Sequence, residues 1–193
     1  MQTIISIECP GATLNEMLRP LLNEMTCIKN VNDVKLVVVG GLNNFLRGKQ
    51  SVTEIKNEAA SFKEKVKAFN SNIVVNFVAL PVIPQLSKLP HDTHSLPKGT
   101  KNRTNEILNY NSYVTSALND TSTLLSMEAL GIVKPISSFD SYVHSSNVKL
   151  GKMHIPEQWE ERNLTYGVHL KKDLKRKFWM EQIKPFFGIA NSS

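Results

Sequence analysis

Two asparagines at the end of an apolar run are the residues of this chain best suited to chemistry. The run is Val34 to Asn44, VKLVVVGGLNN, in which β-branched residues give way to two glycines and then to Asn43 and Asn44. Such a run is typical of a buried parallel strand, and open α/β sheets bind ligands at the carboxyl ends of their strands. Gly41 lets the backbone turn tightly, and side-chain amides can stabilise an oxyanion. The same residues also fit a strand-to-helix turn with an asparagine cap, and this segment alone favours that second interpretation.

The composition predicts one globular domain over residues 1–193. The chain is 41% hydrophobic and 21% charged, and it is long enough to bury one sizeable core. Its formal net charge of +6 favours acidic partners, but few aromatic residues and no dense Lys/Arg block argue against nucleic-acid binding. Cys9 and Cys27 lack C-x-x-C spacing, which fits a reducing compartment and argues against a metal site. No cofactor is predicted.

The sequence contains no apolar window of the length that a membrane span needs. Met1 is followed at once by QTIISIE, without the basic and apolar regions of a signal peptide. We therefore expect a soluble, cytoplasmic protein that makes no membrane contact.

Strand-like apolar runs alternate with helical patterns along the chain, which is the signature of parallel βαβ units. Strands are expected at Thr3–Ile7, Leu36–Val39, Ile73–Leu80 and Leu130–Val133. Helices are expected at Ala12–Met25, Ser51–Phe69, Thr104–Leu118 and Leu174–Phe187. Prolines make Pro81–Gly99 a predicted loop, and Ser137–Glu160 has little pattern.

Three short sequence blocks are informative through their order and their spacing along the chain. They are CPGATL at Cys9–Leu14, GLNN at Gly41–Asn44 and YGVHL at Tyr166–Leu170. These blocks resemble three characteristic blocks of the SGNH (GDSL-like) hydrolases. The resemblance implies an α/β fold, a flavodoxin-like three-layer αβα sandwich with a mainly parallel sheet. It also implies an ancestral chemistry of ester hydrolysis or acyl transfer on a small-molecule ester.

The resemblance assigns a role to several residues of these blocks. Gly11 takes the position of a backbone oxyanion donor, Asn43 that of a side-chain oxyanion donor, and His169 that of the catalytic base. Gly41 and Asn44 belong to the same binding turn.

The departures from the family are as informative as the matches. No Gly-Asp-Ser occurs, so the nucleophile is unknown, and we expect a divergent or N-terminally incomplete domain without the first strand of the family's fold. Tyr166 stands where the family has the aspartate that orients the histidine. We therefore expect little or no esterase activity, and a non-catalytic binding module on the same fold is the alternative.

Three other features leave two interpretations open. Cys9 could replace the missing nucleophile, although a free cysteine is more often a small buried hydrophobe. His91 and His94 have a spacing seen in metal ligands, but loop residues of this kind are usually solvated. A basic stretch could meet phosphate or an acidic partner, although a solvated helix face is the default; its residues are Lys171, Lys172, Lys175, Arg176 and Lys177.

The resemblance also makes two geometric predictions. Gly11, Asn43 and His169 should converge at the carboxyl edge of one parallel sheet. Because unpaired buried backbone groups are costly, Thr3–Ile7 and Leu36–Val39 should either be adjacent in the sheet or be bridged by a strand from another polypeptide. The second arrangement implies a protein partner that covers the sheet.

Overall fold

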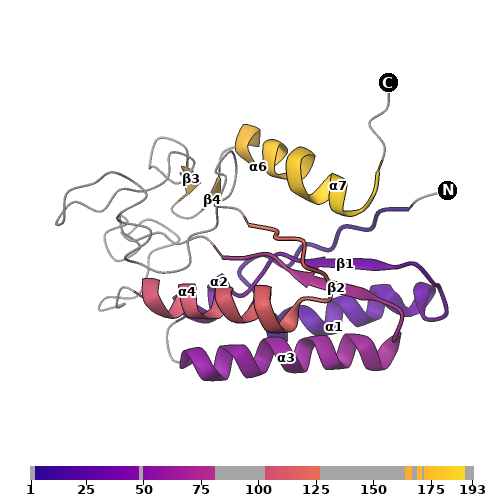
Figure 1. Cartoon of the computed structure of the whole chain (residues 1–193), viewed down its shortest axis with the longest axis horizontal. Coiled ribbons are helices and arrows are strands. Elements are labelled where there is room, and N and C mark those ends of the chain that lie inside the picture. The colour runs from indigo at the N-terminus through magenta and orange to yellow at the C-terminus, as the bar shows by residue number, and fades with distance from the viewer. Residues whose placement is uncertain are drawn as a thin grey trace.

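The computed structural model describes residues 3–47, 50–80, 103–126, 164–166, 169–170 and 172–189. These residues form a mixed α/β structure (Figure 1). In chain order its elements are α1 (Leu14–Glu24), the 3₁₀ turn η1 (Met25–Ile28), β1 (Lys35–Val38), α2 (Leu42–Leu46), α3 (Val52–Phe69), β2 (Val74–Phe77), α4 (Thr104–Tyr113), the π-helical turn η3 (Val114–Leu118), β3 (Leu164–Tyr166), β4 (His169–Leu170), and a C-terminal helix made of α6 (Lys172–Phe178), η7 (Trp179–Ile183) and α7 (Lys184–Phe186). The predicted Pro81–Gly99 loop, Leu130–Val133 strand, Ser137–Glu160 segment and His91/His94 pair lie outside the described residues.

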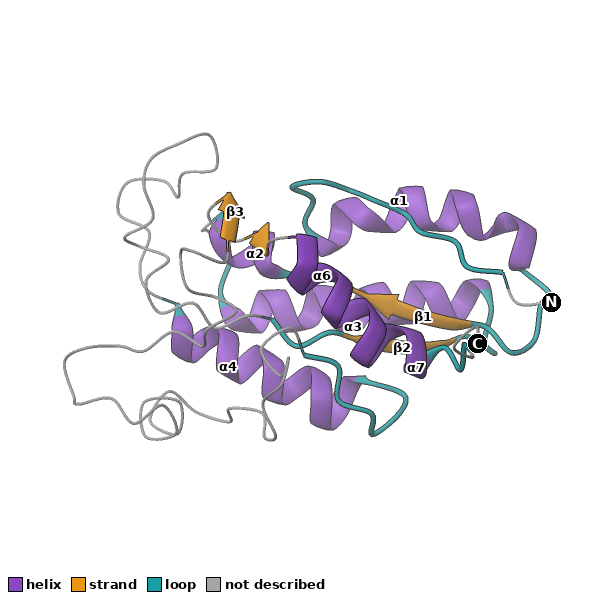
Figure 2. Cartoon of the chain, turned by 90° about the horizontal axis from the view of Figure 1, so that it is seen from above, coloured by secondary structure: helices purple, strands orange, loops and turns teal. Residues whose placement is uncertain are grey.

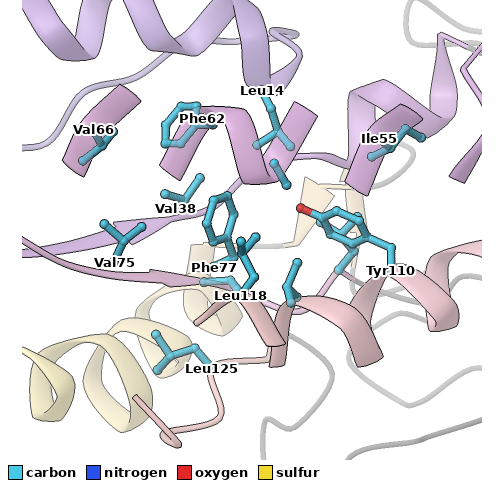
Figure 3. Packing of buried hydrophobic residues seen from close by; sticks show 14 of the residues in the cluster. Leu14, Val38, Ile55, Phe62, Val66, Val75, Phe77, Tyr110, Leu118 and Leu125 are labelled. Atoms are coloured by element: carbon cyan, nitrogen blue, oxygen red, sulfur yellow. The ribbon is translucent and has the colours of Figure 1, made fainter. Parts of the chain in front are cut away.

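A two-stranded parallel sheet organises the core. β1 and β2 pair in the register of Lys35 with Val74 and Val38 with Phe77. Helices α1, α3 and α4 lie on one side of this sheet and the C-terminal helix on the other (Figures 1 and 2). Figure 3 shows Val38 and Phe77 among side chains from α1 and α3, and the ring of Phe62 meets that of Phe77 edge to face at 5.8 Å.

Capping boxes fix where α1 and α3 begin. The backbone N–H of Thr13 donates to the Glu16 carboxylate at 2.9 Å, and that of Ser51 donates to the Glu54 carboxylate at 2.6 Å. Each cap hydroxyl in turn accepts a hydrogen bond from the glutamate's backbone N–H, which satisfies donors that a helix terminus leaves free. The predicted helices at Ala12–Met25 and Ser51–Phe69 are therefore confirmed, with their first helical residues at Leu14 and Val52.

Side chains, rather than a third strand, cover the outer edge of β2. The Asn119 amide accepts from the N–H of Phe77 at 2.7 Å and donates to its C=O at 3.1 Å. The next residue, Asp120, does the same for Val75. Its carboxylate accepts from the Val75 N–H at 2.8 Å, and its backbone N–H donates to the Val75 C=O at 3.0 Å. The backbone groups of this edge are thus satisfied without a ladder.

β1, by contrast, has an open edge. The N–H groups of Val74 and Val78 donate to the C=O groups of Val34 and Val38, each at 2.9 Å. Because alternate residues of a strand turn their backbone groups to opposite sides, the N–H and C=O of Val37 point away from β2. No described residue hydrogen-bonds to them.

The predicted strand at Thr3–Ile7 is wrong. In both views this segment runs beside β1 on the side away from β2, but it forms no ladder with β1 (Figures 1 and 2). Ile4 and Ile5 remain 49% and 50% exposed, so little packing fixes a register for this segment. The prediction that Thr3–Ile7 is adjacent to Leu36–Val39 in the sheet is therefore wrong, because β1 pairs with β2 instead.

Asp120 also joins the sheet to α3 through two ion pairs. Its carboxylate lies 2.7 Å from the ammonium groups of both Lys63 and Lys67. Burial alone would raise the pKa of Asp120, but the hydrogen bonds from the two lysines and from the Val75 N–H outweigh it and lower the pKa to about 2.

This pKa predicts how stability depends on pH. Because the folded pKa of about 2 lies below the usual aspartate pKa of 3.8, the carboxylate's contribution to stability is complete at neutral pH and is lost as the pH falls from 3.8 toward 2. The free energy of unfolding should therefore be lower for Asp120→Asn than for the native chain at pH 7, and this difference should shrink across that acid range in urea titrations. Asp33→Asn, which changes an exposed carboxylate, is the control and should alter stability little. A difference for Asp120→Asn that persists unchanged to pH 2 would contradict the ion-pair account.

Candidate functional site

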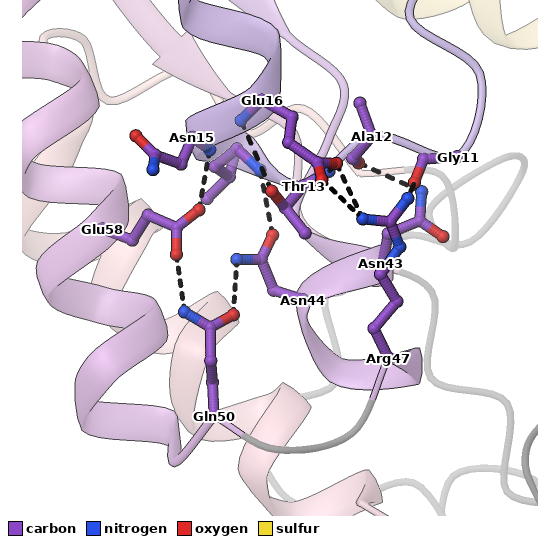
Figure 4. Close-up of polar contacts among 11 residues, drawn as sticks. Gly11, Ala12, Thr13, Asn15, Glu16, Asn43, Asn44, Arg47, Gln50 and Glu58 are labelled. Carbon is purple, nitrogen blue, oxygen red and sulfur yellow. Dashed lines mark hydrogen bonds and ion pairs between the residues drawn. The ribbon is translucent and has the colours of Figure 1, made fainter.

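The Cys9–Ala12 turn and the Gly41–Asn44 turn meet beyond the carboxyl end of β1 (Figure 4). The side-chain N–H of Asn43 donates to the C=O of Ala12 at 3.1 Å, and Arg47 donates to the C=O of Gly11. The structure thus brings Gly11 and Asn43 together, as two members of the predicted site. We call the surrounding network the polar corner; it consists of Gly11, Ala12, Thr13, Leu14, Asn15, Glu16, Asn43, Asn44, Arg47, Gln50 and Glu58.

Gly11 is required by the turn that precedes α1. The N–H of Ala12 donates to the C=O of Cys9 at 3.1 Å, which closes a four-residue turn with Pro10 and Gly11 at its centre. Gly11 has φ +71°, the positive value that the third position of a type II turn demands. A proline followed by a glycine suits this turn, so local backbone geometry explains both residues.

Asn44 caps α1 from a distant part of the chain. Its side chain is 1% exposed; its oxygen accepts from the backbone N–H of Leu14 at 3.0 Å, and its nitrogen donates to the side chain of Gln50 at 2.9 Å. Leu14 is the first residue of α1, whose N–H has no partner within the helix. The segment is thus a strand-to-helix turn, as the second interpretation holds, but its asparagine caps α1 and not the helix that follows, α2, which has Gly41 at its N-cap and no side-chain cap.

The hydrogen bonds continue from Asn44 into α3. Gln50 donates to the carboxylate of Glu58 at 2.6 Å, and the other oxygen of Glu58 accepts from the N–H of Asn15 at 2.7 Å. Gln50 and Glu58 were not predicted as part of this network, because no local sequence spacing links them to α1. The Thr13-x-x-Glu16 pattern of a capping box was a signal that could have been found.

Arg47 closes the polar corner on its exposed side. One of its nitrogens lies 2.8 Å from both carboxylate oxygens of Glu16. The hydrogen bond from the Thr13 N–H, followed by that from Arg47, holds the pKa of Glu16 below its usual range. About half of each side chain is exposed, so this ion pair contributes little to stability and mainly holds the turn at Gly11 in place.

His169 lies in β4, the second strand of a short antiparallel hairpin. Its backbone pairs with Tyr166 of β3. Both views place this hairpin toward the carboxyl end of β1, the end at which the polar corner lies (Figures 1 and 2). The hairpin was not expected, because its two strands are too short for a periodic pattern.

The remaining candidates do not add to the polar corner. Cys9 is half-buried at the start of the Cys9–Ala12 turn, and Cys27 is exposed at the far end of α1. Within the described ranges, no three histidine, cysteine or acidic side chains gather as metal ligands. None of the helices in these ranges has the length and apolarity to cross a membrane. Comparison of the chain with protein-family models, with curated proteins and with solved structures finds no match.

Gly41 faces a buried tyrosine. Gly41 has φ +108° at the start of α2, and a Cβ on it would lie 3.1 Å from the Tyr110 hydroxyl oxygen. Tyr110 is fully buried, with its ring edge to face against Phe45, and its hydroxyl has no hydrogen-bond partner among the described residues. Burial raises the pKa of this hydroxyl, so it stays neutral.

Gly41→Ala should be destabilising for two separable reasons. A left-handed conformation costs a residue with a Cβ about 1–2 kcal/mol, and the new methyl group also presses on Tyr110. Gly188→Ala is the matched control, because Gly188 has φ +69° and a Cβ there would meet no atom within 4 Å. We expect Gly41→Ala to lower the free energy of unfolding more than Gly188→Ala does.

Tyr110→Phe tests the contact itself. Because it removes an unpartnered buried hydroxyl, it should leave stability unchanged or raise it by up to about 1 kcal/mol. In a double-mutant cycle measured by urea unfolding, Gly41→Ala should cost less in the Tyr110→Phe background than in the native chain. Equal costs in both backgrounds would show that the hydroxyl does not restrict Gly41.

Proposed function

We propose that the chain is a divergent domain of the SGNH-hydrolase type, built as the three-layer sandwich that the resemblance implies, which binds a protein partner and does not hydrolyse esters. Two observations support the relationship. The turns that hold Gly11 and Asn43 meet at the carboxyl end of a parallel sheet, and the hairpin with His169 lies toward the same end. Open α/β sheets place their ligand sites at this end.

The main support for the absence of catalysis is that the side-chain amides of Asn43 and Asn44 hydrogen-bond within the fold. An oxyanion donor must point at the place where the substrate's oxygen develops charge. Asn43 directs its amide N–H toward the C=O of Ala12, while Asn44 is buried and engages Leu14 and Gln50. These hydrogen bonds tie the Gly41–Asn44 turn to the residues at the start of α1, so both asparagines already have structural roles.

The histidine block supports the same proposal. A catalytic histidine depends on a carboxylate that fixes its tautomer and stabilises its charged form. Tyr166 occupies that place in the sequence and pairs with His169 across the β3–β4 hairpin. A phenol is neutral at pH 7 and cannot supply the charge of an aspartate.

An ester assay tests the catalytic half of the proposal. The purified chain should hydrolyse p-nitrophenyl acetate no faster than buffer does, and His169→Ala should behave identically. Asn43→Ala should likewise change no rate, but it should lower the free energy of unfolding by about 0.5–1.5 kcal/mol, the net contribution of one hydrogen bond. Turnover above background that both substitutions abolish would establish the competing function, an esterase with a nucleophile other than the family's serine.

The open edge of β1 is where the proposal places the protein partner. An unpaired strand edge pairs readily with a strand of another chain. The backbone groups of Val37 face away from β2; Val39, which directly follows β1, is exposed, as are Ile4 and Ile5 of the N-terminal segment. A partner strand would displace Thr3–Ile7, which no ladder holds in place.

Amide hydrogen exchange along β1 tests this placement. In the dilute chain the N–H groups of Leu36 and Val38, which face β2, should exchange slowly, whereas those of Val37 and Val39 should exchange fast. At high concentration, where an open edge pairs with a second copy, the odd-numbered amides should slow. Uniform slow exchange in the dilute chain would show that the edge is already covered and would contradict the proposed binding surface.

A further inference from the structure

The exposed surface of the C-terminal helix combines positive charge with an aromatic ring. Lys175 and Arg176 are exposed, and one turn further on Trp179 and Met180 remain 36% and 44% exposed. Residues about four apart are neighbours on a helix surface, so Lys175 lies next to Trp179, and Arg176 next to Met180. We call these four residues the basic–aromatic strip.

The opposite face of this helix is docked on the rest of the molecule. Phe178, Ile183 and Phe186 are at most 8% exposed, and the ammonium group of Lys35 donates to the C=O of Phe186 at 2.9 Å. The Gln182 side chain exchanges two hydrogen bonds, each 2.8 Å long, with the backbone of Ser126. The basic–aromatic strip is therefore displayed outward by a helix whose position is fixed.

The charge of this helix is unbalanced. Between Lys172 and Lys184 the sequence has five basic and two acidic residues, in a chain whose net charge is +6. One of the acids, Glu181, has its carboxylate 3.9 Å from the ammonium group of Lys177. The basic–aromatic strip is thus complementary to an anionic partner.

We propose that the basic–aromatic strip binds single-stranded nucleic acid. Lys175 and Arg176 would neutralise backbone phosphates, and the exposed face of Trp179 would stack a base. Base stacking on an aromatic side chain needs a held ring beside cationic groups, and the Trp179 ring is supported by Phe187 at 6.4 Å between centroids. The low aromatic content of the chain argued against nucleic-acid binding. A chain-wide average does not show that one tryptophan lies beside two cations.

The same features fit a lipid surface less well. A helix that binds a membrane inserts its apolar face among the lipids. Here that face is occupied by the core through Phe178, Ile183 and Phe186, and from Lys175 onward the exposed large apolar side chains are those of Trp179 and Met180. Two phosphate contacts and one stacked base match the two cations and the one aromatic ring of the basic–aromatic strip.

Tryptophan fluorescence of the full chain provides the test. The sequence has two tryptophans, so Trp159→Phe makes the emission report Trp179 alone. Titration with an oligouridylate of about 12 nucleotides should quench this emission saturably. The logarithm of the affinity should fall with the logarithm of the salt concentration with a slope of about −1.4, the value for two phosphate contacts on a single strand.

Matched variants separate the basic–aromatic strip from general charge, with binding followed by the anisotropy of a labelled oligomer. Lys175→Gln with Arg176→Gln should bring the slope close to zero, whereas Arg19→Gln with Lys65→Gln, which removes two exposed cations from α1 and α3, should leave most of the slope and affinity. Trp179→Ala should weaken binding about tenfold, and Trp179→Phe less, because stacking contributes about 1–3 kcal/mol per base. Circular dichroism confirms that each variant is folded.

Several results would overturn the proposal. The native chain could leave the oligomer unbound, or the two charge variants could weaken binding equally. Binding to phosphatidylserine vesicles without binding to the oligomer would assign the basic–aromatic strip to a membrane instead.

Discussion

The buried side chain of Asn44 is the contact on which the arrangement of α1, α2 and α3 depends. It completes the N-terminus of α1 through Leu14 and reaches α3 through Gln50 and Glu58. Removing one partner from a buried hydrogen bond costs about 1–3 kcal/mol, because the other partner loses both water and protein contacts. The turn that follows β1 is therefore held by the fold, because the buried Asn44 side chain is committed to these contacts.

The small sheet depends on a related use of side-chain amides. Three of them each hydrogen-bond to both the N–H and the C=O of one residue, as a neighbouring strand would; the pairs are Asn119 with Phe77, Asn111 with Leu80, and Gln182 with Ser126. The first of these pairs, together with the hydrogen bonds between Asp120 and Val75, satisfies the outer edge of β2. No described side chain hydrogen-bonds to the outer edge of β1 in this way, so a further strand can pair with the sheet on that side.

The sequence could predict those elements whose patterns arise from burial. The 18-residue helix α3 and the strands β1 and β2 follow from their apolar periodicity, and the Ser51-x-x-Glu54 pattern marks the start of α3. The strand expected at Thr3–Ile7 failed, because β-branched residues give a propensity while pairing depends on packing that the sequence does not reveal. The proximity of Gly11 and Asn43 followed from the resemblance. The hydrogen bond from the Leu14 N–H to the Asn44 side-chain oxygen spans thirty residues, and no local signal predicts it.

Hydrogen exchange at the Leu14 amide tests most directly whether the asparagines serve the fold. The first N–H of a helix has no partner within the helix and normally exchanges almost freely. Because this N–H is bonded to the buried Asn44 side chain, it should exchange slowly in the native chain and fast in Asn44→Ala, while Asn43→Ala leaves it slow. A Leu14 amide that exchanges as fast in the native chain as in Asn44→Ala would contradict the account and would leave Asn44 free for a ligand.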